Sequence, residues 1–240
     1  MLTVEPKRLG LKPGDRVLDL GCGRGRHVYA MYWGDTPVHV VGADLSAEEV
    51  KATFDGFFDL PPPENPSPLR SATLSAADAA KLPFCDDAFD AVICSEVLEH
   101  VDDPDAVLAE IMRVTKPGAT IALSVPRYWP EALCWKLSSE YSQTPGGHVR
   151  IFTDDRLRAS ARRAGLRFTH RHWAHALHSP YWWLQCALWK SRDTSTLVAL
   201  YRRFLEWDLM KRPLLTRGLD ALLNPVMGKS LVMYFSKPAS

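Results

Sequence analysis

Short apolar runs alternate with longer stretches of helical periodicity along most of this chain. The runs are rich in Val, Ile, Leu and Ala and have the length of strands. Five of them are expected before residue 126, over 16–20, 38–44, 72–76, 88–95 and 120–125. One of the helical stretches between them begins after Ser46, a typical N-cap that is followed by acids in the first turn. Strands that alternate with helices favour βαβ units and a parallel sheet.

The pattern changes after the fifth strand. We expect a helix over 153–164, because a threonine caps it and a glycine ends it, then a sixth strand over 166–174 and a seventh over 230–235. About fifty residues between the last two strands exceed what a hairpin needs. We expect residues 1–240 to form a single domain, with 179–228 as a helical insertion within it.

A glycine-rich loop, Asp19-Leu20-Gly21-Cys22-Gly23-Arg24-Gly25, follows the first strand. Glycines let the chain turn sharply out of a strand and bring bare backbone against a ligand. The carboxylate of Asp19 would repel a pyrophosphate but attract an ammonium group, so a zwitterionic cofactor fits this loop better than a dinucleotide. Asp44 ends the second strand, about twenty residues further on, where doubly wound folds hold ribose hydroxyls.

Five segments in order resemble the motifs of class I S-adenosylmethionine-dependent methyltransferases, in the small-molecule branch that includes the ubiquinone and menaquinone methyltransferases. They are the glycine motif in 12–23, Asp44, the adenine loop 78–84, the fourth strand with the helix after it in 89–101, and the turn 113–119. The resemblance runs from about Leu11 to Phe168. It implies an α/β enzyme with a Rossmann-like, seven-stranded, mostly parallel sheet and helices on both faces; the helical insertion between strands six and seven departs from the family pattern.

The resemblance also implies the cofactor, S-adenosyl-L-methionine, and the residues that hold it. The backbone at Gly21 and Gly23 would contact its methionyl part and Asp19 its ammonium group. Asp44 would bind the ribose, and Asp78 the adenine amine. The full expected set is Asp19, Gly21, Cys22, Gly23, Gly25, Asp44, Leu45, Asp78, Ala79, Ser95 and Glu96.

Two groups of residues raise the question of a metal. Glu96, Glu99 and His100 match a Glu-x-x-Glu-His pattern that is implicated in divalent metal binding in the ubiquinone O-methyltransferases. The same Leu-Glu-His tripeptide recurs in relatives that use no metal, where it packs the helix after strand four, and we favour that role. A second group, four histidines within 170–178, lies in a basic stretch without a clear carboxylate ligand. We therefore expect no metal.

Methyl transfer usually needs a base to take the proton of the acceptor, and histidine is the usual candidate. His148 follows a Pro-Gly-Gly segment after strand five, a region that faces the acceptor in the resembling family. We therefore expect His148 to be the base or an acceptor anchor. His175 and His178 are the alternatives.

Aromatic residues concentrate in the second half of the chain, and seven of the eight tryptophans lie beyond Tyr128. Only about fifteen residues precede the first strand, whereas many relatives cover the acceptor with amino-terminal helices. We therefore interpret 179–228 as an acceptor lid, with Tyr128, Trp129, Trp182 and Trp183 as substrate contacts. The alternative is that these rings only pack the insertion onto the sheet.

Charge divides the chain into two parts. Residues 1–149 hold 13 Lys and Arg against 22 Asp and Glu, and residues 150–240 hold 16 against 6, so balances of −9 and +10 give the net +1. The basic part could attract a phosphorylated substrate or a membrane surface, or simply the acidic part.

No apolar segment has the length of a membrane span, the start lacks an apolar signal core, and the five cysteines are scattered. We expect a cytoplasmic protein with reduced thiols, a small-molecule acceptor and no nucleic-acid partner; oligomeric state is not indicated.

Three functions are compatible with these features. The first is methyl transfer to O or C of a hydrophobic small molecule of quinone, polyketide or isoprenoid type. The second is methylation of a sugar or lipid-linked glycan, for which aromatic platforms would serve equally. The third is a non-catalytic cofactor-binding module or a dehydrogenase. Asp19 argues against the dehydrogenase, and the intact cofactor motifs argue against an inactive module.

Overall fold

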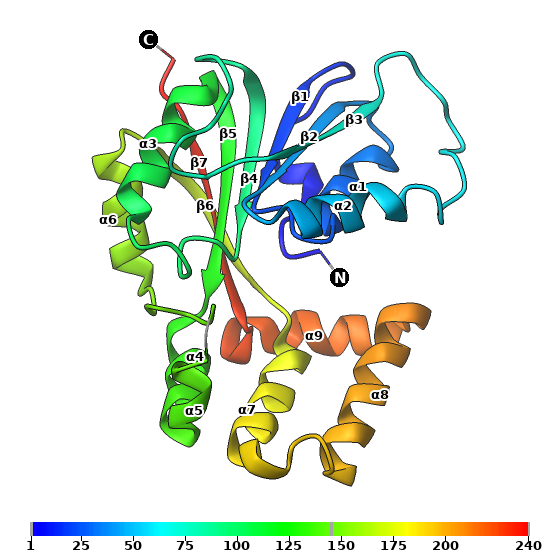
Figure 1. Cartoon of the computed structure of the whole chain (residues 1–240), viewed down its shortest axis with the longest axis vertical. Helices are drawn as coiled ribbons and strands as arrows, with labels where there is room; N and C mark the ends of the chain where they lie inside the picture. The colour runs from blue at the N-terminus through cyan, green and yellow to red at the C-terminus, as the bar shows by residue number, and fades with distance from the viewer. Residues whose placement is uncertain (1, 145, 240) are drawn as a thin grey trace.

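The computed structural model describes residues 2–144 and 146–239. One seven-stranded sheet with the order β3-β2-β1-β4-β5-β7-β6 forms its centre (Figure 1). The strands are β1 (Arg16–Leu20), β2 (His39–Asp44), β3 (Ser71–Ala76), β4 (Phe89–Ser95), β5 (Thr115–Pro126), β6 (Arg167–Ala174) and β7 (Ser230–Ser236). Neighbouring strands from β3 to β5 are parallel, and β7 is antiparallel to both β5 and β6. The predicted mostly parallel, seven-stranded sheet is confirmed.

β5 begins five residues before the predicted start at residue 120. Thr115 already pairs with Phe89, and the register then shifts before Ala91 pairs with Thr120. Pro117 and Gly118 break the apolar pattern between these pairs, so the sequence concealed the early part of the strand.

Helices cover both faces of the sheet, as predicted. They are α1 (Arg26–Tyr32), α2 (Ala47–Gly56), α3 (Pro104–Val114), α4 (Tyr128–Leu137), α5 (Ser139–Ser142), α6 (Asp154–Arg163), α7 (Ser179–Ala187), α8 (Thr196–Lys211) and α9 (Leu214–Met227), with short 3-10 turns η1 (Pro6–Arg8), η2 (Ala176–His178) and η3 (Trp189–Ser191). Leu18 of β1 packs in one core with Leu108 of α3 and Leu157 of α6. Its neighbour Val17 packs in the other core with Val28 of α1, because alternate residues of a strand face opposite sides.

A group of helices, which we call the helical cap, lies beyond the end of the sheet where β5 finishes (Figure 1). It consists of α4 and α5, which follow β5, and α7, α8 and α9, which occupy the insertion between β6 and β7. The helical insertion was predicted, but α4 and α5 were not. Trp129 of α4 and Trp183 of α7 pack with ring centroids 5.3 Å apart, so the two segments form one cover.

The amino-terminal segment packs against the sheet. Thr3, Val4 and Leu9 are buried, and the backbone N–H of Glu5 donates to the hydroxyl of Tyr234 at 2.9 Å. Val4 and Leu9 belong to the same core as Val28 of α1. None of the described helices has the length and apolar character that crossing a bilayer requires.

Candidate active site

The glycine loop leaves β1 at the edge where its parallel neighbours also end. Gly21 has φ +72°, and a Cβ at this position would lie 2.1 Å from Cγ2 of Val97 in the segment after β4. Only glycine permits both this backbone conformation and this approach. The crevice between β1 and β4, where the strand order reverses, is the usual ligand position in such a sheet.

Asp19 lies at the bottom of the loop with 1% of its surface exposed. Within the described residues, neither carboxyl oxygen has a hydrogen-bond partner, and burial raises the pKa of Asp19 to about 7. Nδ1 of His27 lies 3.7 Å away, but burial lowers the pKa of this imidazole to about 3, so it is neutral. An unpartnered buried carboxylate is costly unless a cation meets it. The loop therefore fits a ligand with an ammonium group.

Asp44 joins the end of β2 to the glycine loop. Its carboxylate accepts hydrogen bonds from the N–H of Gly23 at 2.8 Å and of Ser46 at 2.9 Å. Each oxygen keeps a lone pair for a further donor such as a ribose hydroxyl. Leu45 follows with 77% of its surface exposed, which places an apolar side chain beside the loop.

The remaining expected cofactor residues lie at the ends of β3 and β4. The carboxylate of Asp78 accepts from the N–H of Ala80 at 2.9 Å and so shapes the loop that also carries Ala79. The hydroxyl oxygens of Ser95 and Ser124 are 2.8 Å apart, and Ser124 donates to Glu96 at 3.1 Å. Glu96 has φ +58°, a strained value for a residue with a side chain.

A cluster of acids and histidines lies next to this edge. Glu99 is 1% exposed, and neither of its carboxyl oxygens has a partner in the described chain. Burial, and then the charge of Glu96, raises its pKa well above the ordinary value. One oxygen of Glu99 and one ring nitrogen each of His100 and His148 lie within 4.8 Å of one another, close enough to share an ion. The sequence suggested the first two of these residues together, but not His148 beside them.

The segment that carries His148 is held against the end of β4. The N–H of Val149 donates to the carbonyl of Glu99 at 2.9 Å, and the carbonyl of Gly147 lies 3.1 Å from Nδ1 of His100. The guanidinium of Arg150 donates to the carbonyls of Leu98 and Asp102 at 3.0 and 2.9 Å. These contacts hold a loop that is remote in sequence against the segment that follows β4.

Nδ1 of His148 lies 2.7 Å from Oε1 of Glu131, a residue of α4 that is 2% exposed. Burial favours a higher pKa for Glu131, but the hydrogen bond and charge of His148 outweigh it and the net pKa is lowered. The hydroxyl of Tyr141 donates to the other oxygen of Glu131 at 3.3 Å. Sequence reasoning missed both Glu131 and Tyr141, because an acid in the first turn of a helix is ordinary and carries no sign of a distant histidine.

His175 and His178 form a separate pair, with ring centroids 5.5 Å apart. Nε2 of His175 lies 3.1 Å from the hydroxyl of Thr3, and burial lowers the pKa of both imidazoles. His175 also has φ +66°. Its hydrogen bond ties the start of the cap to the amino-terminal segment.

Lys229 is near enough to both histidine groups to influence their titration. Its charge acts on Glu99 and Glu131 on one side and on His175 and His178 on the other. Its ammonium group is 5.2 Å from the ring centroid of Trp182. No motif singled out this lysine, because it lies alone between a helix end and a strand.

The expected substrate aromatics have different environments. The indole N–H of Trp129 donates to the carbonyl of Val226, and that of Trp183 to the carbonyl of Pro130, both at 3.1 Å. These two rings hold α4, α7 and α9 together, which agrees with the packing alternative. The ring centroid of Trp182 lies 6.0 Å from that of Tyr141, whose hydroxyl donates to Glu131. Tyr128, at the start of α4, is half exposed.

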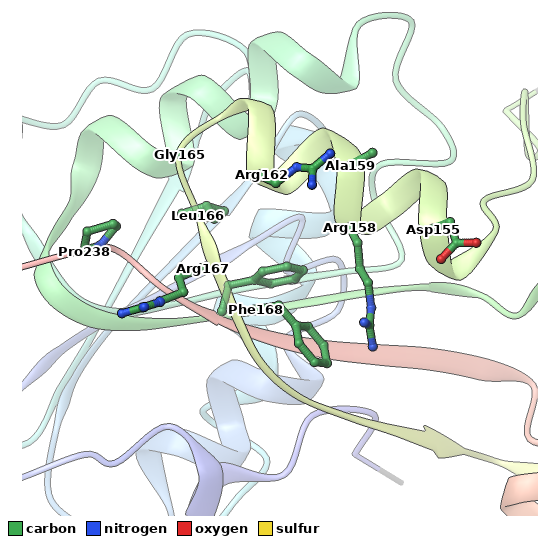
Figure 2. A pocket seen from close by; sticks show the side chains of 10 residues that line it. Asp155, Arg158, Ala159, Arg162, Gly165, Leu166, Arg167, Phe168 and Pro238 are labelled. Carbon is green, nitrogen blue, oxygen red and sulfur yellow. The ribbon is translucent and has the colours of Figure 1, made fainter.

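A hollow of about 780 Å³ lies elsewhere, between α6 and β6 (Figure 2). Its lining includes Arg158, Arg162 and Arg167, but Figure 2 shows the three side chains spreading in different directions. Arg158 lies instead over the ring of Phe168, 3.7 Å from its centroid. This hollow contains none of the motif residues, so we assign no part of the reaction to it.

Comparison with known proteins agrees with this geometry. Residues 3–171 match the family model described as "Methyltransferase domain". The chain is 31% identical over 159 residues to 27-O-demethylrifamycin SV methyltransferase of Amycolatopsis mediterranei, covering 66% of this chain and 56% of that protein. It is 36% identical over 118 residues to demethylmenaquinone methyltransferase of Corynebacterium urealyticum, covering 49% and 44%. The matched regions thus span about half the length of these curated relatives.

Among solved structures, a methyltransferase of Methanosarcina mazei aligns over 100% of both chains, with a TM-score of 0.67 and 16% identity. At that identity the likeness concerns the fold alone. The family match, in contrast, covers well over half of the chain and includes every motif around the glycine loop. The chain therefore belongs to the class I S-adenosylmethionine-dependent methyltransferase family.

Proposed function

We propose that this protein transfers a methyl group from S-adenosylmethionine to O or C of a hydrophobic small molecule of quinone, polyketide or isoprenoid type. The observation that carries the proposal is the pair of half-buried His148 and buried Glu131, with 2.7 Å between Nδ1 and Oε1, at the same edge of the sheet as the glycine loop. The relatives named for rifamycin and menaquinone precursors support an acceptor of this size and polarity.

In this proposal the cofactor is held by the residues expected from the motifs. The unpartnered carboxylate of Asp19 meets the ammonium group, Asp44 takes the ribose hydroxyls and Asp78 the adenine amine. Leu45 and Ala79 supply apolar contacts to the adenine. The bound sulfonium supplies an electrophilic methyl group; the protein supplies alignment and a closed site.

His148 acts as the general base. Its Nδ1–H donates to Glu131, which sets the tautomer and leaves the lone pair of Nε2 for the acceptor proton. The buried carboxylate also stabilises the imidazolium that forms when the proton is taken. Lys229 and Trp182 border the same space, where a cation and an aromatic face suit an electron-rich acceptor such as a phenolate.

A divalent cation at Glu99, His100 and His148 is a second candidate for the same step, favoured by the 4.8 Å spacing and by the unpartnered carboxylate of Glu99. It would activate an acceptor hydroxyl as a Lewis acid. A glycan acceptor remains an alternative, since Trp182 and Tyr128 would serve as stacking platforms. A non-catalytic module is disfavoured, because it has no need of a histidine paired with a buried glutamate at the edge of the sheet where the glycine loop ends.

The test uses purified protein, S-adenosylmethionine and a panel of hydroxylated quinones, phenols and glycosides, with S-adenosylhomocysteine release as the readout. His148→Ala should lower turnover by about 10² to 10⁴-fold while the affinity for S-adenosylhomocysteine stays within about 2-fold. Glu131→Gln should lose less, because it keeps the shape but removes the charge. His170→Ala, which changes a histidine of β6 outside the cluster, is the matched control.

Full turnover in His148→Ala would refute the base assignment. Loss of turnover with EDTA and its recovery with Mg²⁺ would favour the cation. Turnover of glycosides alone would move the acceptor to the glycan class, and no S-adenosylhomocysteine release with any acceptor, despite tight binding, would favour the module.

A further inference from the structure

α9 has its polar side toward the protein and its apolar side toward solvent. Thr216 and Asp220 are buried. The exposed positions one helical turn apart on the other side are Leu215 (83% exposed), Leu219 (42%), Leu222 (73%) and Val226 (64%). A helix on a globular domain normally has the opposite orientation.

Hydrogen bonds fix this orientation. Asp220 accepts from the N–H of Leu177 at 3.1 Å, and the side-chain oxygen of Asn224 accepts from the N–H of Ala176 at 2.9 Å. The amide of Asn224 also donates to Asp220 at 3.3 Å. A rotation of α9 that buried its leucines would break these bonds and leave backbone donors of η2 without partners. The outward apolar face is therefore built into the packing.

The apolar face continues onto α8 through the turn between the helices. Met210 is 80% exposed and Leu214 82%. Leu200 and Trp207 of α8 are also exposed, at 64% and 48%. We call the following exposed residues of both helices and their turn the α8–α9 surface: Leu197, Leu200, Trp207, Met210, Leu214, Leu215, Leu219, Leu222 and Val226. Many large exposed apolar side chains on two consecutive helices are typical of an interaction site.

The charges of the two helices indicate which kind of partner the α8–α9 surface binds. The same two helices and their turn carry exposed basic residues: Arg202, Arg203, Lys211, Arg212 and Arg217. Of the three acids in the two helices, Asp208 and Asp220 are buried and only Glu206 is exposed. A second copy of this chain would set these cations against each other. An anionic lipid surface satisfies both the cations and the leucines.

We propose that the α8–α9 surface binds the face of an anionic lipid bilayer, with α9 lying in the plane of the interface. The leucines enter the boundary between headgroups and acyl chains, and the arginines and Lys211 contact lipid phosphates. This inference rests on the exposed face of the cap and is independent of the acceptor identity.

The test is co-sedimentation of the full chain with vesicles of phosphatidylcholine alone and with about one third phosphatidylglycerol. Binding is expected only with phosphatidylglycerol and should weaken as salt rises. Leu215→Asp combined with Leu222→Asp should lower the partition coefficient at least about 10-fold. Lys211→Gln combined with Arg212→Gln should lower it by roughly 25-fold, about 5-fold for each cation removed.

Leu60→Asp and Lys7→Glu, which change exposed residues outside the surface, are the matched controls and should bind as the unmodified protein does. Circular dichroism and the affinity for S-adenosylhomocysteine check that the variants fold. Equal binding by the surface variants, or no binding to either vesicle, would overturn the proposal. A dimer in light scattering that Leu215→Asp dissociates, without vesicle binding, would assign the surface to a second copy.

Discussion

The cofactor half of the sheet and the helical cap are built by different rules. Around the glycine loop, short segments meet because parallel strands end at one edge, and each functional group lies within a few residues of a strand end. In the cap, α4 and α7 come from separate parts of the chain and are joined by tryptophan packing and side-chain bonds to backbone. The family match stops at residue 171, within β6, so the helices α7 to α9 lie outside it.

The two regions also place buried charge differently. In the cofactor half, the carboxylate of Asp19 has no hydrogen-bond partner among the described residues, which suits a site that binds a cationic group. In the cap, Asp220 is hydrogen-bonded to the backbone and serves the fold. Of these two acids, the carboxylate without hydrogen-bond partners fits a ligand, and the carboxylate bonded to backbone N–H groups stabilises the fold.

The largest effects are expected at Asp19. In the unfolded chain its carboxyl ionises near 3.8 and in the folded chain near 7, so the folded state holds a proton that the unfolded state releases. Stability therefore falls as pH rises from about 4 to 7 and is constant above that window. Asp19→Asn removes this loss and should stabilise the ligand-free protein at pH 8 by up to about 4 kcal/mol, while S-adenosylhomocysteine affinity falls at least about 10²-fold.

Urea unfolding at pH 5 and pH 8, together with calorimetry, measures both effects. Glu99→Gln is the matched control, because Glu99 is equally buried and unpartnered but belongs to the acceptor cluster. It should gain stability at pH 8 and keep the cofactor affinity. If Asp19→Asn left the affinity for S-adenosylhomocysteine unchanged, Asp19 would not bind the cofactor and would not differ from Glu99 in this respect.

The next effect is expected at Asp44. Asp44→Ala removes the acceptor of two backbone N–H groups and the expected partner of the ribose. The affinity for S-adenosylhomocysteine should fall about 10- to 100-fold, since hydrogen bonds to a charged group contribute about 1.5 to 3 kcal/mol each. Calorimetry with Asp35→Ala, an exposed acid, as control decides this; equal affinities would make Asp44 a purely structural residue.

In the cap, the corresponding change is Asn224→Ala. It leaves the N–H of Ala176 without its acceptor and should lower the free energy of unfolding by about 1 to 3 kcal/mol. Cofactor affinity should stay the same. Leu222→Ala, on the exposed side of the same helix, should change stability by less than about 0.5 kcal/mol. A loss of cofactor affinity in Asn224→Ala would show that the two regions are coupled.

The smallest effect concerns the aromatic residues of the cap. Trp182→Ala should raise the Michaelis constant of the acceptor by roughly 3- to 10-fold, because one ring contact contributes about 0.5 to 1.5 kcal/mol. Trp183→Ala should act mainly on stability, since its ring packs on Trp129 and its N–H is already used. Steady-state kinetics with Trp207→Ala as control separates the two. Equal acceptor Michaelis constants in these three variants would show that the tryptophans of the lid only pack the helices and do not contact the acceptor.

The sequence by itself determined the sheet, the glycine loop and the family, because strand periodicity and glycine chemistry are local properties. Strands β1 to β4, the capped helix α6 and the helical insertion all lie close to their predicted ranges. The side chains at strand ends, such as Asp44, could be assigned to one edge because parallel strands place their carboxyl ends together.

Only the tertiary structure decided the rest. His148, in a loop, pairs with Glu131, near the start of a helix, 17 positions away in the sequence. Neither segment has a sequence feature that predicts this contact. The outward face of α9 was equally hidden, because an amphipathic pattern shows that a helix has two sides but not which side meets the protein. That choice depends on whether η2 offers backbone donors or apolar side chains, and here Asp220 and Asn224 take its N–H groups.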